Sequence, residues 1–360
     1  MTVVAVDAEL GATKTSLGPV TERPVTDEFL RLADEHFSAG RYEDAARQYR
    51  LALSADPGNR RAETGYNRSI RQCVPRWHFE MLHDEERAIR YDKAITQLVS
   101  SDSLVLDVGT GSGLLAMMAA RAGAAEVVAC EAQPFVAEVA GQIIAAAGYS
   151  DVVMMVPKLS TDMRVPADLP RRADLLVTET VDCGLLGEGV LATIAHAREQ
   201  LLTPDAQIVP GRARVLATLV ESESLYRKNH VGEHYGFDLS GFNLMASVEY
   251  FDSRLMKHEH RILSEPVEVF EFDFYRDGPE PASTDLVIVP SMAGSCHAIV
   301  FWFELELIPG VELSNSPEDP NTHWKQAVQC LPMAVDVRRG EPLPLTARHD
   351  GLHIHFEVRP

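Results

Sequence analysis

Three successive patterns of hydrophobic and polar positions follow one another along the chain. The first is helical, because apolar residues recur at helical spacing over residues 29–37 and again over residues 42–53. This pattern predicts a helical unit over residues 26–74. The preceding residues 1–25 are small and polar, and we expect them to form a flexible tail.

The order of small and aromatic residues in this unit resembles a tetratricopeptide repeat. Small residues there let two helices approach, while aromatic residues fill the groove between them. Gly40 and Pro57 predict where the two helices end. An ordinary helical hairpin is the alternative. Because one repeat cannot bury its apolar face alone, we expect a following helix near residues 60–73, or the next domain, to cover it.

The second pattern, over residues 75–210, alternates short apolar runs with helical stretches. The runs are continuous, which is typical of parallel strands buried on both faces. They fall at residues 104–108, 127–130, 152–156 and 175–177, with helical composition at 114–121 and 135–146. This order predicts a doubly wound, Rossmann-like α/β domain.

The third pattern, over residues 211–360, alternates apolar and polar positions and has Pro and Gly between the runs. It predicts an antiparallel, barrel-like β domain, with strands near residues 212–220, 267–274, 297–307 and 352–358. The aromatic, His-containing stretch at 222–250 fits no strand pattern, and we expect it to be an excursion from this domain.

Composition narrows the class of protein. The 360 residues include 53 Asp and Glu against 33 Lys and Arg, a net charge of −20. This acid excess disfavours a nucleic-acid partner, which requires a basic patch, and it suits a small or basic substrate. The 5 cysteines form no CxxC pair, so neither a disulfide framework nor a metal site is indicated. Without a signal peptide or a run of ~20 apolar residues, the chain is predicted to be cytoplasmic and not membrane-bound.

A glycine-rich turn directly follows the first predicted strand. Gly109, Gly111 and Gly113 permit a sharp turn and a close approach of a ligand to the backbone. Asp107, at the end of the strand, suits a hydroxyl or an amino group better than a phosphate. Glu131 ends the next strand, where an acidic side chain can hold ribose hydroxyls. These features predict S-adenosylmethionine as the cofactor, and a cofactor-free strand–turn–helix is the alternative.

Two glutamates border a second glycine-containing loop. Glu179 follows a predicted strand directly and therefore lies at the carboxyl edge of the sheet, where α/β active sites form. Glu188 comes nine residues later in the chain, so the two carboxylates are placed to clamp a planar cation such as a guanidinium. A solvated acidic loop is the alternative interpretation.

Five segments, in this order, resemble the motifs of the protein arginine methyltransferases. They are WHFEMLHDEER at residues 77–87, VLDVGTGSGLL at 105–115, ACE at 129–131, ETVDCGLLGEG at 179–189 and THW at 322–324. The resemblance covers roughly residues 75 to 360. It is greatest to a divergent branch outside the type I enzymes, which includes a member with tetratricopeptide repeats. The resemblance implies a Rossmann-like, S-adenosylmethionine-dependent methyltransferase domain followed by a β-barrel domain.

The resemblance also implies a role for each motif residue. Glu179 and Glu188 would grip the substrate guanidinium, and His323 would close over it near Asp84. Arg87 would pair with the methionine carboxylate of the cofactor. The other implied positions are Met81 for catalysis and His78, Asp107, Gly109, Gly111, Gly113, Glu131, Ser160 and Thr161 for the cofactor.

The loop between the two glutamates departs from the type I pattern. Type I enzymes carry aromatic residues and Met there, whereas this chain has Thr180, Val181, Asp182 and Cys183. That difference argues against asymmetric dimethylation, but His323 is the residue that type I enzymes use. The product therefore stays open between monomethyl, symmetric and asymmetric dimethyl arginine. Asp182 adds a third carboxylate, which we expect to favour arginines flanked by basic residues.

Taken together, these features predict methyl transfer to a guanidino nitrogen of arginine in a basic protein or peptide. By family likeness, residues 222–250 would form the arm of a homodimer. Two alternatives stay open, namely a methyltransferase acting on a small guanidino or amine metabolite and a non-catalytic adaptor built on the tetratricopeptide-like unit. The intact Arg87, Glu179 and Glu188 count against the adaptor.

Overall fold

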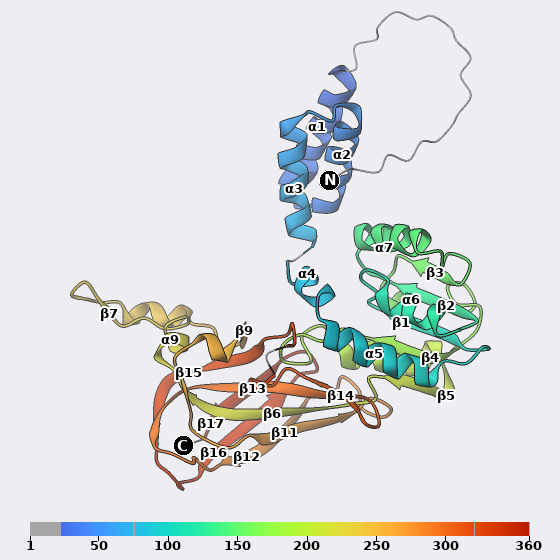
Figure 1. The fold of residues 1–360 in the computed structure, drawn as a ribbon. Helices are drawn as coiled ribbons and strands as arrows, with labels where there is room; N and C mark the ends of the chain where they lie inside the picture. Colours follow the sequence, from blue (N-terminus) through green and yellow to red (C-terminus); the bar gives the residue numbers. More distant parts are fainter. Residues whose placement is uncertain (1–22, 75, 320, 360) are drawn as a thin grey trace, which may run out of the picture. The chain divides into compact units, whose positions relative to one another are not determined.

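The computed structural model describes residues 23–74, 76–319 and 321–359 (Figure 1). The chain divides into two compact units, whose boundary in the sequence lies between Arg76 and Trp77. The first unit contains the helices α1 (Arg23–Ser38), α2 (Tyr42–Ala55) and α3 (Arg60–Cys73). The helix expected near residues 60–73 is therefore present.

Small side chains allow the three helices of the first unit to pack closely. The core consists of Leu30, Ala33, Ala45, Tyr49, Ala52 and Ala62. A Cβ atom added at Gly65 would lie 2.3 Å from the Tyr49 ring, so only glycine lets α3 approach α2 at this point. Asn59 begins α3 as its N-cap, with its side chain accepting a hydrogen bond of 3.1 Å from the Ala62 N–H.

The second unit begins with the α/β domain, whose five strands form one parallel sheet in the order β3-β2-β1-β4-β5. The predicted Rossmann-like domain is confirmed, with β5 as a strand that the hydrophobic runs did not reveal. The strands are β1 (Leu104–Val108), β2 (Glu126–Cys130), β3 (Val153–Val156), β4 (Ala173–Thr178) and β5 (Leu202–Val209). The helices are α4 (Trp77–Leu82), α5 (Glu85–Leu98), α6 (Leu114–Arg121), α7 (Pro134–Ala146) and α8 (Val190–His196), with short turns η1 (Ser160–Asp162) and η2 (Ala197–Leu201).

The β domain follows, and all of its strand pairs are antiparallel, as predicted. Its larger sheet contains β6 (Arg212–Glu221), β9 (Phe251–Ser253), β10 (Arg261–Ile262), β11 (Val267–Asp273), β13 (Gly294–Ile308), β14 (Val311–Ser314) and β15 (Gln326–Val337). Its smaller sheet contains β12 (Ala282–Ile288), β16 (Leu343–His349) and β17 (Ile354–Val358). The large buried side chains of Phe301, Phe303 and Phe356 fill the core of this domain.

Residues 222–250 form the expected excursion, which leaves the domain after β6 and returns at β9 (Figure 1). The excursion contains α9 (Glu223–Tyr226), a hairpin of β7 (Glu233–His234) with β8 (Phe237–Asp238), and η3 (Ser240–Met245). The turn η4 (Leu255–Lys257) follows β9. Across the described residues, we find no helix with the length and apolar character needed to cross a membrane.

Candidate active site

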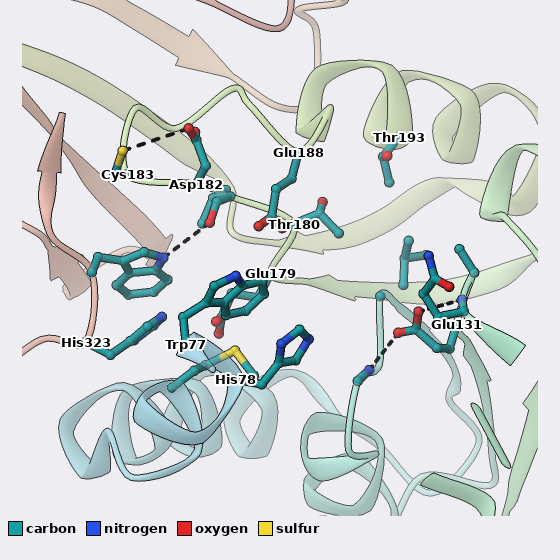
Figure 2. Close-up of a pocket in the computed structure, with 18 of the residues that line it drawn as sticks. Trp77, His78, Glu131, Glu179, Thr180, Asp182, Cys183, Glu188, Thr193 and His323 are labelled. Atoms are coloured by element: carbon teal, nitrogen blue, oxygen red, sulfur yellow. Dashed lines mark hydrogen bonds between the residues drawn. The ribbon is translucent and has the colours of Figure 1, made fainter. Parts of the chain in front are cut away.

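A cleft of about 740 Å³ lies in the second unit, lined by α4, by loops that follow β1, β2 and β4, and by the β domain (Figure 2). Because the parallel strands end there, it lies at the edge of the sheet where α/β active sites form. Nine of the residues singled out in the sequence line it: His78, Met81, Gly109, Gly111, Glu131, Ser160, Glu179, Glu188 and His323. Five others, Asp84, Arg87, Asp107, Gly113 and Thr161, are not among its lining residues.

One end of the cleft is built from backbone groups around Glu131. The Gly111 N–H donates to one oxygen of Glu131 at 3.1 Å, and the Gln133 N–H donates to the other at 2.9 Å. These two bonds fix the carboxylate at the end of β2. Gly109 has φ of 71°, and a Cβ atom there would lie 2.7 Å from the Thr180 side chain. At Gly111 an added Cβ atom would meet nothing closer than 4.0 Å, so its backbone is open to an approaching ligand.

Asp107 and Gly113 support this loop from behind. Thr110 Oγ1 donates to Asp107 Oδ2 at 2.5 Å, whereas the buried Oδ1 has no hydrogen-bond partner among the described residues. Burial raises the pKa of Asp107 to about 7. Gly113 begins α6 with φ of 83°, and a Cβ atom there would lie 2.9 Å from Ile144. Both residues therefore shape the loop from outside the cleft.

The residues of η1 differ in placement. Ser160 is buried and lines the cleft, whereas Thr161 is exposed and is not among the lining residues. The sequence motif pointed to this segment as a whole, and only one of its two candidates reaches the cleft. Because η1 is only one short turn, its hydrophobic pattern does not show which of its side chains face the cleft.

The two glutamates of the 179–188 loop have different surroundings. The Glu179 side chain is 5% exposed and accepts a hydrogen bond from Arg87 Nε. The Arg87 side chain is 4% exposed. Burial raises the pKa of Glu179, although the Arg87 guanidinium acts in the opposite direction. Glu188 is open to solvent, and no described residue donates a hydrogen bond to it. Partial desolvation in the cleft, together with the charges of Asp182, Glu179 and Glu131, raises the pKa of Glu188 to about 7.

Asp84 joins the start of α5 to the THW segment. As the N-cap of α5, it accepts a bond of 2.9 Å from the Arg87 N–H through Oδ1. Its Oδ2 accepts from the His323 N–H at 2.8 Å and lies 2.9 Å from His323 Nδ1. Burial by itself would raise the pKa of Asp84, but the hydrogen bonds from His323 and Arg87 outweigh it and hold the pKa below its ordinary value. The structure thus brings Asp84 and His323 together, as the resemblance implied.

Three residues of the β domain hold the 179–188 loop: Trp324, which belongs to the THW motif, and Asn315 and Tyr250, to which no motif drew attention. Trp324 Nε1 donates to the Val181 carbonyl at 3.2 Å. Asn315 Nδ2 donates to the Cys183 carbonyl at 3.0 Å. Tyr250 Oη donates to Asp182 Oδ2 at 2.8 Å. Tyr250 lies at the end of the excursion, and no motif in the sequence points to it.

The parallel sheet, the glycine-rich loop after β1 and the acidic residue after β2 define a Rossmann-like methyltransferase domain joined to a β domain. Family models agree with this class. Residues 211–359 match the arginine methyltransferase oligomerization subdomain, and residues 93–197 match the ribosomal protein L11 methyltransferase model.

Relatives identify the family. An arginine N(omega)-methyltransferase of Streptomyces achromogenes subsp. streptozoticus is 42% identical over 295 residues, which cover 82% of this chain and 80% of that protein. Protein arginine N-methyltransferase 7 of Drosophila ananassae is 33% identical over 78% of this chain, but only 47% of that protein is covered. The chain thus spans about half the length of the Drosophila relatives. It belongs to the arginine methyltransferase family, a class of S-adenosylmethionine-dependent enzymes.

Solved structures show the same fold. The Trypanosoma brucei PRMT1 enzyme–prozyme heterotetrameric complex with AdoHcy superposes with a TM-score of 0.69 at 24% identity, covering 79% of this chain and 93% of that one. Arabidopsis thaliana protein arginine methyltransferase 10 superposes with a TM-score of 0.62 at 22% identity, and the match covers 76% of this chain and 88% of that one.

The residues in the cleft fit S-adenosylmethionine. Its ribose carries two hydroxyl groups, and the fixed carboxylate of Glu131 can accept hydrogen bonds from both. The open backbone at Gly111 leaves room for a close approach. No group of His, Cys, Asp and Glu side chains that could hold a metal ion occurs in the part of the chain that the structure describes.

Proposed function

We propose that this protein transfers a methyl group from S-adenosylmethionine to a guanidino nitrogen of arginine, with Glu179 and Glu188 clamping the guanidinium. The observation that carries this proposal is that both carboxylates line the same cleft as Gly111 and Glu131. A cofactor at one end and a guanidinium at the other would therefore share one enclosed space, which favours direct transfer between them.

The chemistry requires a clamp because a free guanidinium is a poor nucleophile. Its charge is delocalised over three nitrogens, and its pKa is far above neutrality. Two carboxylates draw that charge onto the nitrogens they contact and leave electron density on the third. S-adenosylmethionine, when bound, supplies an activated methyl group. The protein would then hold the attacking nitrogen in line with that methyl group, so that the N–C bond forms as the S–C bond breaks. S-adenosylhomocysteine would leave as a neutral thioether, and the methylated nitrogen would give up one proton.

The differing surroundings of the two glutamates suit different tasks. Arg87 fixes Glu179 from behind, so one wall of the clamp is rigid. We propose that Arg87 also neutralises the methionine carboxylate of the cofactor, as in the family motif. Glu188 has no partner among the described residues and is free to bind the substrate. His323, held by Asp84, would close the cleft over the bound arginine, and His78 and Met81 would cover the cofactor.

A basic protein or peptide is the first substrate class that we propose. The cleft is lined by the carboxylates of Glu80, Glu131, Glu179, Asp182, Glu188 and Asp252, whereas its two lysines are already paired. Lys158 forms an ion pair with Asp168, and Lys325 forms one with Asp252. The resulting negative field favours a cationic substrate.

Free arginine is the second candidate. The relative with 42% identity is named an arginine N(omega)-methyltransferase, whereas the Drosophila relatives are named protein arginine methyltransferases. Both candidates place a guanidinium in the same clamp. They differ only in what surrounds the α-carbon of the substrate.

One experiment tests the activity and separates the two candidates. The full chain is incubated with labelled S-adenosylmethionine and either an Arg/Gly-rich peptide or free arginine, and the methylarginines are identified after hydrolysis. Peptide labelling that free arginine does not suppress supports the protein substrate. Labelling of free arginine alone supports the second candidate, and no label in any arginine refutes the proposed activity and favours an adaptor.

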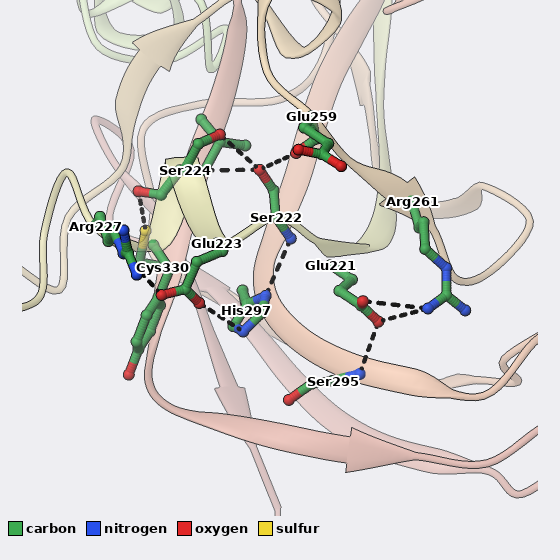
Figure 3. A network of polar contacts seen from close by, with 12 residues as sticks. Glu221, Ser222, Glu223, Ser224, Arg227, Glu259, Arg261, Ser295, His297 and Cys330 are labelled. Carbon is green, nitrogen blue, oxygen red and sulfur yellow. Dashed lines mark hydrogen bonds and ion pairs between the residues drawn. The ribbon is translucent and has the colours of Figure 1, made fainter.

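We also propose that residues 222–250 form the arm of a homodimer. The arm exposes large apolar side chains, which in a monomer would face water: Tyr235, Phe237, Phe242, Leu244 and Met245. Its base is fixed, because the Ser222 N–H donates to His297 Nδ1 at 3.0 Å and Ser222 Oγ donates to the Glu259 carbonyl at 2.7 Å (Figure 3). Sedimentation of the wild type and of Leu244→Asp would test the association.

The helical unit over residues 26–74 is proposed to be tetratricopeptide-like and to bind a partner or substrate. Its packing of small residues around Tyr49 supports that interpretation. Removal of this unit would then change the choice of substrate and leave turnover of a short peptide intact.

A further inference from the structure

The 179–188 loop belongs to the α/β domain, yet three consecutive residues of it are held by the β domain. The carbonyls of Val181 and Cys183 and the side chain of Asp182 each accept a hydrogen bond from that domain. The donors are Trp324, Asn315 and Tyr250. The position of the loop therefore depends on residues far away in the sequence.

Asp182 uses both of its oxygens inside the protein. Oδ1 accepts from the Gly184 N–H at 3.2 Å and from the Gly187 N–H at 2.8 Å. Oδ2 accepts from Tyr250 Oη at 2.8 Å. Asp182 is therefore not a third carboxylate available to basic residues beside the target arginine, as its place in the sequence suggests, because its oxygens are bound within the protein.

The loop is shaped tightly around these contacts. A Cβ atom added at Gly187 would lie 2.5 Å from Asp182 Oδ2, and one at Gly184 would lie 2.6 Å from the Tyr250 ring. The buried Leu185 has φ of 81°, which is unfavourable for a leucine and requires the surrounding contacts to hold it. Tyr250 is itself packed edge-on against Phe301 of the β-domain core, with ring centroids 5.1 Å apart.

We propose that Asp182 is a positioning residue, which ties the 179–188 loop to Tyr250 and thereby sets where the Glu188 carboxylate lies in the cleft. Glu188 directly follows Gly187, whose N–H is bound by Asp182, so releasing that bond moves Glu188. This inference rests on the proposed function, because Glu188 is the carboxylate that we propose binds the guanidinium. A misplacement of about 1 Å is enough to slow a reaction by about 10²-fold.

Four variants test the proposal. Asp182→Ala removes the bonds from Gly184, Gly187 and Tyr250, together with the long contact of 4.0 Å from Cys183 Sγ. Tyr250→Phe removes only the bond from the β domain. Asp182→Asn keeps an acceptor for the two glycine N–H groups and an amide that can donate to Tyr250, but it removes the charge. Tyr149→Phe is the matched control, since Tyr149 is a partly buried tyrosine of the α/β domain that lies outside the cleft and outside residues 222–250.

Amide hydrogen exchange over residues 182–188 measures the loop directly and needs no activity. We expect faster exchange in Asp182→Ala and Tyr250→Phe, because the Gly184 and Gly187 amides lose a fixed acceptor. We expect wild-type exchange in Tyr149→Phe. Unchanged exchange in both site variants would overturn the proposal.

Steady-state kinetics then measures the consequence for Glu188. We expect kcat to fall by about 10²-fold in Asp182→Ala and by about 10-fold in Tyr250→Phe, with the affinity for S-adenosylmethionine unchanged. Asp182→Asn should keep kcat within a few-fold of wild type. Because the charges of Asp182, Glu179 and Glu131 all raise the pKa of Glu188, that variant should also shift the acidic limb of the pH–rate profile to lower pH.

The outcomes separate this inference from the proposed function. Faster exchange with unchanged turnover would show that the loop loosens without misplacing Glu188, and it would overturn the positioning role. A loss of activity matched by an equal loss in Tyr149→Phe would also overturn it. If the wild type methylates no arginine, the proposed function fails, while the exchange data still decide whether Asp182 and Tyr250 hold the loop.

Discussion

The two ends of the cleft are built in different ways. At the cofactor end, Glu131 is fixed by the backbone N–H of Gly111, only 20 residues before it. At the substrate end, Glu179 pairs with Arg87, which is 92 residues away, and Asp84 binds His323, which is 239 residues away. The first end depends on local backbone geometry, and the second depends on how distant segments pack against one another. Substitutions should therefore separate cofactor binding from turnover.

The largest effect is expected from the clamp itself. Glu188→Gln removes the charge that we propose binds the guanidinium, and kcat should fall by about 10³-fold or more. The affinity for S-adenosylmethionine should stay within two- to three-fold of wild type, since the cofactor end is untouched. A radiolabel assay beside cofactor calorimetry measures both quantities, and wild-type turnover would refute the clamp.

Substitution of Asp84 is expected to have a smaller effect on turnover and also to lower the stability of the protein. Asp84→Ala removes both the cap of α5 and the anchor of His323, so kcat should fall by about 10²-fold and the free energy of unfolding by about 1–2 kcal/mol. Asp84→Asn keeps an oxygen for the cap and should recover most of the stability but not the activity. Urea denaturation and turnover measure the two losses, and full activity of the asparagine variant would contradict the proposed role of the carboxylate.

At the end of the cleft that we propose binds the cofactor, a substitution should weaken cofactor binding and leave turnover nearly unchanged. Glu131→Gln weakens an acceptor for the ribose hydroxyls, and Kd for S-adenosylmethionine should rise by about 10-fold. At saturating cofactor, kcat should remain within a few-fold of wild type. Calorimetry gives Kd directly. A loss confined to kcat would remove the proposed distinction between the two ends.

The activity should also depend on pH through Glu188. Its pKa of about 7 means that the carboxyl is protonated below pH 7 and ionised above it. Since we propose that the ionised form binds the guanidinium, kcat/KM should fall towards tenfold per pH unit as the pH drops below 7. Asp107 also has a pKa of about 7, so the profile of Asp107→Asn is the control. Loss of the acidic limb in that variant would assign it to Asp107 instead.

The smallest effect separates Ser160 from Thr161, the two cofactor candidates in η1. Thr161 is exposed and outside the cleft, so Thr161→Ala should change Kd for S-adenosylmethionine by less than about two-fold. Ser160 is buried and lines the cleft, and Ser160→Ala should weaken binding more. Equal effects on calorimetric Kd would contradict this placement.

The same contrast explains what could be predicted from the sequence. Strand β1, the three glycines and Glu131 lie in consecutive segments, and a buried parallel strand followed by a glycine turn has a clear hydrophobic pattern. The pairing of Arg87 with Glu179 was not predicted, since the motif suggested a cofactor carboxylate as the partner of Arg87. Nor could spacing show that Asp182 faces Tyr250, because the contact depends on how β9 returns from the excursion. Strand β5 was missed because its exposed polar positions interrupt the apolar run.

The three donors that hold the 179–188 loop have a consequence for protein engineering. Trp324, Asn315 and Tyr250 all belong to the β domain, while the groups that fix Glu131 all belong to the α/β domain. A chimaera that exchanges the β domain for that of a relative would replace these three donors to the loop and none of the donors to Glu131. Such an exchange offers a modular route to retune substrate preference while the methyl donor stays the same.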